Sequence, residues 1–394
     1  MMPQFAPSSA LRQDLARWIR ASLGVSVILF IASIVGAFFS PHDFFRSYLT
    51  GFLICTGLAL GSLGILMLQY LTGGAWGVVS RRTLEAATRT LPLLALLFIP
   101  IAFGIPFLYD WAHPELVVRE AVLQHRHEWM NPTLFIVRTI VYFAIWILFA
   151  WLLNKWSADE DKGGAEATKF SRLSAPGLIV YVFTVTFSSV DWAESLTTDW
   201  YSTMWGFLFV AMQCLSSMAF VIVVLGLLAE REPMSHTLRP VHFHDLGKML
   251  LMFVMIWAYF SFSQLLIVWE GDLAGEITWY IRRMNTSWGW FGGALIVFQF
   301  IIPFLLLLSR PLKRNRKLLA GVVGLLLAMR FVEMFWIVMP SYYQRGFRLV
   351  WLNFTTPLAL IAIWCAAFCW ELGKRPLMPL HAPNLEAALQ HVEA

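Results

Sequence analysis

Ten runs of mostly apolar residues follow one another along the chain, separated by short polar segments. A run of about 18 or more apolar residues is long enough to cross the hydrocarbon core of a bilayer as an α-helix. The runs cover residues 20–39, 47–70, 91–109, 133–154, 174–191, 201–228, 246–270, 287–308, 318–339 and 350–370. The pattern predicts an all-α integral membrane protein with about ten transmembrane helices.

One predicted helix, over residues 245–270, carries more polar side chains than its neighbours. Tyr259, Ser263 and Glu270 are spaced by four and seven residues, so they share one face of an α-helix. Polar side chains in a bilayer are costly unless they face protein or water. We therefore expect this face to turn inward and to join an inner polar route to the outer surface. Other polar residues lie at the start of the helix and on its adjoining face: His244, Asp245, Lys248, Trp257, Ser261 and Gln264.

The composition agrees with a membrane protein, because only 13% of the 394 residues are charged against roughly 25% in soluble domains. Most of the 29 lysines and arginines lie in the two terminal segments and in the even-numbered connections between helices. This bias predicts that both termini are cytoplasmic, and it gives no reason to expect a nucleic-acid partner. The expected regions are a cytoplasmic segment (1–19) with Leu11 and Leu15 on the membrane surface, a ten-helix transmembrane domain (20–370) and a cytoplasmic tail (371–394).

The same orientation brings several charged residues near the outer face of the membrane. The carboxylates are those of Asp191, Glu194, Glu270 and Glu333. Arg330 lies three residues before Glu333, a spacing at which two side chains on a helix can pair. Two interpretations remain open: interfacial caps and structural ion pairs, or an outer site for protons or a quinone headgroup.

Histidine and cysteine offer no redox centre. All nine histidines lie in loops, in tails or at the start of a helix, whereas a membrane-embedded b-type haem needs axial histidines within the spans. The four cysteines lie inside apolar runs, where thiols are usually inert. The pairs His125/His127 and His242/His244 have metal-compatible spacing without the signature of a metal site. We expect no metal, haem or iron–sulfur cluster in this chain.

Three stretches together resemble a known family. They are SVDWAESLTTDWYSTMWG (189–206), HFHDLGKMLLMFVMIWAYFSFSQLLIVWEGD (242–272) and AMRFVEMFWIVMPSYY (328–343). They resemble the polysulfide-reductase NrfD-like membrane subunits, in particular the second such subunit of bacterial alternative complex III, a quinol:cytochrome c oxidoreductase. The resemblance implies two four-helix bundles, formed by helices 2–5 and 6–9 and flanked by helices 1 and 10.

The resemblance also implies a function and partners. The chain would be a subunit of a quinol-oxidising respiratory complex in the bacterial inner membrane, supporting quinone interaction or proton movement. Its partners would be lipid, an NrfD-like quinol-oxidising paralogue, an iron–sulfur protein, and multihaem cytochrome c subunits that pass electrons to a cytochrome c or a terminal oxidase. Haem and iron–sulfur clusters would then belong to the partners. Two departures concern loop contacts: EGDLAGEITWY (270–280) stands where relatives commonly have Asn and Pro, and Ala193 where they have Met.

Two alternatives remain open. A solitary proton-coupled secondary transporter could use the same carboxylates, although such transporters often have paired Gly/Pro-broken helices in corresponding halves, and no convincing pair is found here. A non-catalytic scaffold subunit, which only holds its neighbours in the membrane, would need no site at all.

Overall fold

The computed structural model describes residues 5–163 and 167–390, and these residues form helices joined by turns and loops, with no strand among them. Within them, nine helices are long and apolar enough to cross a membrane, and a bent pair of helices makes a tenth candidate. The prediction of an all-α membrane protein with about ten helices is therefore confirmed. The spans that consist of one α-helix are α1 (Ser9–Phe39), α2 (Pro41–Thr72), α8 (Pro132–Glu160), α9 (Ala167–Trp192), α10 (Trp205–Leu228), α11 (Pro240–Gly271), α16 (Arg316–Val338) and α17 (Leu352–Leu372).

Two spans are interrupted. The third consists of α3 (Ala75–Thr88), α4 (Leu91–Leu97) and α5 (Ile99–Leu108), and it bends by 53° at the start of α5. Pro100 lies at this bend, where a proline removes a backbone donor and kinks a helix. The span was predicted to begin at residue 91, and the residues before it were expected to form a connection. Most of that connection is helical and forms α3. The eighth span consists of α13 (Trp288–Ala294), the π-helix η4 (Leu295–Ile301) and α14 (Ile302–Leu308).

Among the described residues, five short α-helices lie outside the spans. One of them, α12, occupies part of the connection expected between the seventh and eighth spans. Its apolar and basic side chains recur at helical spacing over ITWYIRRM, a pattern typical of an amphipathic helix. The short helices are α6 (Pro114–Arg119), α7 (Ala121–Arg126), α12 (Ala274–Met284), α15 (Arg310–Arg314) and α18 (Leu385–Gln390).

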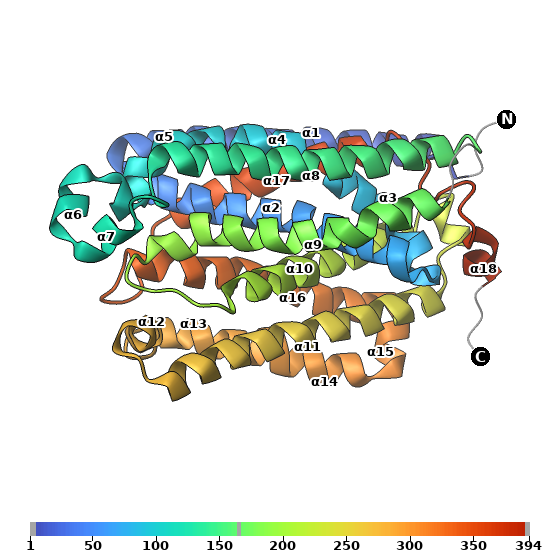
Figure 1. The fold of residues 1–394 in the computed structure, drawn as a ribbon. Coiled ribbons are helices and arrows are strands. Elements are labelled where there is room, and N and C mark those ends of the chain that lie inside the picture. Colours follow the sequence, from blue (N-terminus) through green and yellow to red (C-terminus); the bar gives the residue numbers. More distant parts are fainter. Residues whose placement is uncertain (1–4, 164–166, 391–394) are drawn as a thin grey trace.

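The centre of the molecule is formed by α2 and α10. Both are buried along most of their length, whereas α1 and α11 are largely exposed. α10 packs against α2, α9, α11 and α16, and α17 packs against α1 and α2. In Figure 1, α4, α5 and α8 lie on one side of this central pair, and α11 to α15 lie on the other.

A glycine makes the contact between α2 and α10 close. A Cβ atom on Gly61 would lie 2.1 Å from the backbone oxygen of Gln213, so no larger residue fits without moving the backbone. One turn away, Ser217 donates a hydrogen bond to the backbone oxygen of Leu58 at 2.8 Å. Close backbone approach with a hydroxyl bridge is typical of helix contacts in membranes.

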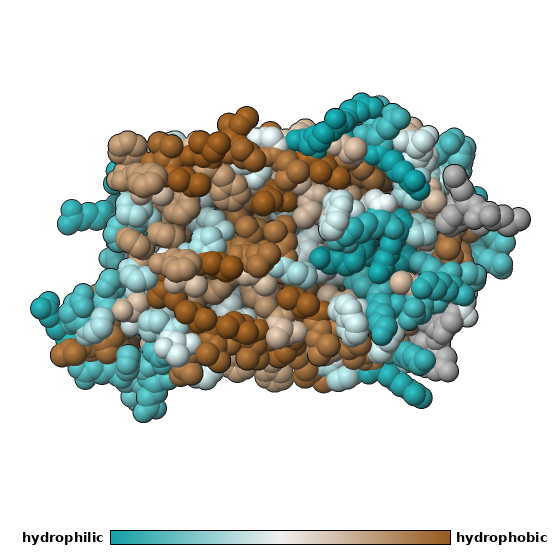
Figure 2. All heavy atoms as spheres, turned by 90° about the horizontal axis from the view of Figure 1, so that it is seen from above, coloured by the Kyte–Doolittle hydropathy of each residue, from teal (hydrophilic) through white to brown (hydrophobic). Residues whose placement is uncertain are grey.

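The surface has an apolar band between two hydrophilic ends (Figure 2). Large apolar side chains stand out from this band, for example Phe38 and Phe39, which are 84% and 85% exposed. The first and last described segments of the chain lie at one end, here called the termini end, and α6, α7 and α12 lie at the opposite end, here called the far end (Figure 1). A band of this kind is the surface that a bilayer would cover.

The N-terminal segment is not separate from the first span. α1 starts at Ser9 and continues without a break into the apolar run. Leu11 and Leu15, which we expected on the membrane surface, are buried. The C-terminal tail packs against this segment: the backbone N–H of Leu377 donates to the backbone oxygen of Phe5 at 2.9 Å, and a Cβ built on Gly373 would lie 3.3 Å from the side chain of Leu15.

Candidate functional site

A cavity of about 670 Å³ lies between α10, α11, α12, α13 and α16. We call it the far-end cavity, because α12 and the ends of α11 and α16 that form it lie at the far end (Figure 1). Its volume is in the range of sites for small organic molecules. Aromatic side chains form a third of its wall residues, among them Trp205, Trp257, Trp279, Tyr280 and Trp336.

A glutamate from α16 forms the polar part of the wall on one side. Glu333 is 2% exposed and accepts hydrogen bonds from Trp257 Nε1 at 2.6 Å and from Arg330 Nη1 at 2.9 Å. The predicted pairing of Arg330 with Glu333 is therefore confirmed. A buried carboxylate is tolerated only when it is paired and hydrogen-bonded, and here both oxygens have a donor. Trp257 links α11 to this pair, which fixes the rotation of α11.

The second polar part of the wall comes from α12 and α11. Gln264 Nε2 donates to the hydroxyl oxygen of Tyr280 at 3.1 Å. Burial raises the pKa of Tyr280 to about 12, so the phenol stays neutral and keeps a proton that it can donate. Within the described part of the chain, the side-chain oxygen of Gln264 is buried and has no hydrogen-bond partner.

Arg283 is the least compensated charge in the wall. Its guanidinium lies 3.5 Å from the centre of the Trp279 ring and donates to the backbone oxygens of Trp279 and Ile337 at 3.1 and 3.3 Å. Among residues 5–163 and 167–390 it has no carboxylate within 4 Å, and its Nε atom has no acceptor. Burial holds the pKa of Arg283 well below its usual range. An uncompensated buried cation is costly, and a further acceptor in the cavity would reduce this cost.

The cavity opens toward the apolar band. Phe262 and Ile296, on its rim, are 61% and 55% exposed. Gly292 and Gly293 leave room on the side of α13, and no atom lies within 4 Å of a Cβ built on Gly293. The π-helix η4 follows directly, and π-helical turns are frequent at functional sites. A ligand could therefore enter from the hydrocarbon region.

This arrangement suits a flat, neutral molecule with oxygen acceptors at one end and an apolar tail. Indole and phenol rings can stack on a planar ring. Arg283 and Tyr280 can donate to carbonyl oxygens, and the oxygen of Gln264 can accept from a hydroxyl. Such a molecule would give partners to the buried polar atoms that lack them among the described residues, and its tail would leave through the apolar opening.

The other expected outer carboxylates lie elsewhere. Asp191 accepts from Arg138 at 2.9 and 2.8 Å and from the hydroxyl of Tyr142 at 2.9 Å, on the side of α8 and α9. Glu194 is buried and accepts from the backbone N–H of Ser202 at 2.6 Å. Glu270 is exposed. Of the four carboxylates, only Glu333 lines the far-end cavity.

The polar face expected to turn inward on α11 is only partly buried. Tyr259 is 65% exposed at the rim of the cavity, and Ser263 is half-buried. The buried face is the adjoining one, with Trp257 and Gln264. The expectation was wrong for Tyr259 and Glu270, because the contact of Trp257 with Glu333 and the packing on α10 and α16 set the rotation of α11.

The residues at the start of α11 lie far from this site. His244 is buried at the termini end, and Lys248 donates to Asp245 at 3.2 Å. Between them and Trp257, the buried residues of α11 are apolar, including Leu250 and Val254. The structure therefore does not bring His244, Asp245 and Lys248 together with the cavity into one polar route along α11.

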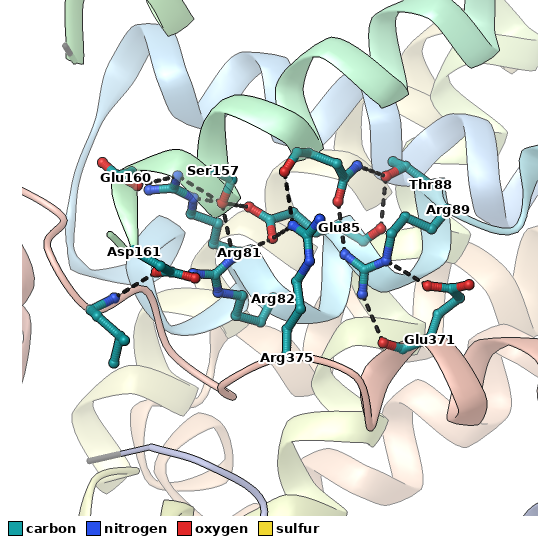
Figure 3. A network of polar contacts seen from close by, with 12 residues as sticks. Arg81, Arg82, Glu85, Thr88, Arg89, Ser157, Glu160, Asp161, Glu371 and Arg375 are labelled. Atoms are coloured by element: carbon teal, nitrogen blue, oxygen red, sulfur yellow. Dashed lines mark hydrogen bonds and ion pairs between the residues drawn. The ribbon is translucent and has the colours of Figure 1, made fainter. Parts of the chain in front are cut away.

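An ionic network at the termini end was not predicted (Figure 3). Glu85, on α3, is completely buried between Arg81 and Arg82, with oxygens 3.1 and 2.7 Å from their nitrogens. From α8, Ser157 donates to Glu85 at 2.6 Å. The remaining members are Thr88, Arg89, Asn154, Glu160, Asp161, Glu371 and Arg375. The helical spacing of Arg81, Glu85 and Arg89 was a usable signal, but these residues had been assigned to a connecting loop.

No group of three or more His, Cys, Asp or Glu side chains in the described residues is arranged to hold a metal ion.

Trp279, Tyr280 and Arg283 were not predicted as site residues, because their segment was expected to be a loop and forms α12. Their i, i+1, i+4 spacing was the available signal.

A comparison with models of protein families finds no match, and a comparison with curated proteins finds none either.

Proposed function

We propose that this chain is a quinone-interacting membrane subunit of a quinol-oxidising respiratory complex in the bacterial inner membrane. The observation that carries the proposal is the far-end cavity: about 670 Å³, aromatic, open to the apolar band, and lined by buried polar atoms that have no partner among the described residues. In the complex, the chain would bind a quinone or quinol, while haem and iron–sulfur centres would belong to partner subunits. The termini end would face the cytoplasm, in line with the excess of lysine and arginine there.

Arg283 and Tyr280 would donate to the ring oxygens of the bound quinone, and Glu333 would hold Trp257 in place beside it. The apolar tail would leave between Phe262 and Ile296. Membership of a multisubunit complex is supported by the resemblance of the three sequence motifs to NrfD-like subunits.

A photoreactive quinone with an azide group tests the site on the complex purified in mild detergent. We expect labelling of peptides from α11, α12 or α13, displaced by excess unlabelled quinone. Gly293→Leu would place a side chain in the open space of the cavity and should reduce labelling by at least about tenfold. Gly321→Leu is a matched control, because a Cβ built there also meets no atom within 4 Å, outside the cavity.

Labelling that is equal in both variants would refute quinone binding in this cavity. The same preparation tests the complex: co-isolation with multihaem cytochrome and iron–sulfur subunits is expected. A chain that is purified alone from native membranes would favour a solitary transporter.

A further inference from the structure

A second cavity, of about 420 Å³, lies between α4, α8 and α17 near the termini end. We call it the termini-end cavity. It borders the ionic network of Figure 3, with which it shares Thr88, Arg89, Asn154, Glu371 and Arg375. The far-end cavity and the termini-end cavity have no lining residue in common, so this is a separate site.

The wall of the termini-end cavity is divided by polarity. One part is apolar, with Pro92, Ile147, Ala150 and Trp151. Trp151 is 54% exposed, which is the usual position of a tryptophan at the edge of a bilayer. The other part is strongly basic. Its cations are Arg89, Lys155, Lys374 and Arg375, and its carboxylate is that of Glu371.

The single carboxylate is shared by two of the cations. Arg89 Nε donates to one oxygen of Glu371 at 2.7 Å, and Lys374 Nζ donates to the other at 2.6 Å. Arg375 donates to the backbone oxygen of Asn154 at 2.9 Å and lies 3.7 Å from a carboxylate oxygen of Glu85. Lys155 lies over the ring of Trp151 at 5.0 Å. Among the described residues, no carboxylate lies within 4 Å of Lys155. The cavity thus keeps an excess of positive charge.

We propose that the termini-end cavity binds the phosphate group of an anionic phospholipid from the adjacent leaflet. The phosphate is held by Lys155, Lys374 and Arg375, and the acyl chains lie along Ile147 and Trp151. Basic pockets between transmembrane helices on the cytoplasmic side suit anionic headgroups. The apolar part of the wall favours a lipid over free phosphate, because a small ion would leave that part uncovered.

Binding of phosphatidylglycerol to the delipidated full chain in detergent, measured by native mass spectrometry, tests the site. The double variant Lys155→Gln/Lys374→Gln should bind this lipid about 30-fold more weakly, since each lysine at a membrane surface contributes appreciably to anionic-lipid affinity. Lys155→Arg/Lys374→Arg should keep most of the affinity, because the charge remains. Lys162→Gln/Lys317→Gln removes the same charge from exposed lysines at the same end and should leave affinity unchanged.

Phosphatidylcholine and inorganic phosphate are the two comparison ligands. Weak binding of both to the unmodified chain supports the proposal. Equal losses of phosphatidylglycerol binding in the two glutamine double variants would overturn it, because the effect would then be one of general charge. Inorganic phosphate that binds as tightly as the lipid would also overturn it and assign the cavity to free phosphate. An unchanged melting temperature of the variants confirms that they are folded.

Discussion

Both ends of the molecule bury arginine and glutamate, yet the two regions differ in how these charges are compensated. At the termini end, each network arginine contacts a carboxylate: Arg81 and Arg82 contact Glu85, and Arg89 contacts Glu371. At the far end, Arg283 contacts backbone oxygens and aromatic rings only, among the described residues. The centre of the network, at Glu85, is completely buried, whereas the side chains around Arg283 line a cavity.

The difference indicates two roles for buried charge. A compensated network fixes the relative positions of α3, α8 and α17, and its loss is a loss of stability. An uncompensated cation beside a cavity costs stability in the empty state and gains an acceptor when a ligand binds. The following substitutions separate the two roles.

The largest effect is expected for Glu85→Gln. The change leaves Arg81 and Arg82 without their central carboxylate, and breaking a buried ion pair costs about 3–5 kcal/mol. The melting temperature of the purified chain should fall strongly, while quinone labelling per folded molecule should stay unchanged. Glu128→Gln, at an exposed carboxylate, is the control and should leave the melting temperature as it is. A normal melting temperature for Glu85→Gln would show that the network does not stabilise the fold.

An intermediate effect of another kind is expected for Arg283→Met. Replacing an uncompensated buried charge by an apolar side chain of similar length should leave the free energy of unfolding unchanged or raise it. The affinity for quinone should fall by about tenfold or more, because a hydrogen bond from a charged donor contributes about 1.5–3 kcal/mol. Competition of unlabelled quinone with the photoreactive probe measures the affinity. A stability loss as large as that of Glu85→Gln, with affinity unchanged, would place Arg283 among the structural charges.

The smallest effects are expected for Glu270→Gln and Asp245→Asn. Glu270 is exposed, and Asp245 pairs with Lys248, whose side chain is 57% exposed. Exposed pairs contribute about 0–1 kcal/mol, so melting temperature and quinone labelling should both stay close to those of the unmodified chain. Proton movement coupled to quinol oxidation tests whether these two carboxylates take part in a proton route. It is measured on assembled complex and normalised to the haem of the partner subunits. A marked loss there would show that a route outside the far-end cavity carries protons.

The spans could be predicted from the sequence because each is a long apolar run, and membrane helices must satisfy their backbone hydrogen bonds within themselves. The ion pair of Arg330 and Glu333 was also predictable, because a spacing of three residues places both side chains on the same face of one helix. The rotation of α11 about its own axis could not be predicted from the sequence. Its polar residues occupy two faces, and the contact of Trp257 with Glu333, 76 residues away, decides which face is buried.

Long-range pairing also explains why the ionic network was missed. Glu85 meets Ser157, and Arg89 meets Glu371, 282 residues further along the chain. From the sequence, these residues are basic or acidic side chains near helix ends, where solvent exposure is the usual outcome. The far-end cavity was foreseen only as a set of outer carboxylates. Five of its polar side chains were named beforehand (Trp257, Tyr259, Ser261, Gln264 and Glu333), and α12 supplied Trp279, Tyr280 and Arg283.

The contact at Gly61 limits how the molecule can move. Alternating access requires one half of a transporter to rock against the other, and such rocking needs an interface that slides or opens. Here the two central helices meet backbone to backbone, and the hydroxyl of Ser217 is bonded across the joint. Any tilt of one half against the other would have to separate this close backbone contact and break the hydrogen bond of Ser217. The contact resists both sliding and opening of the two helices. The chain is therefore better suited to hold a site in a fixed position than to carry a solute across the membrane.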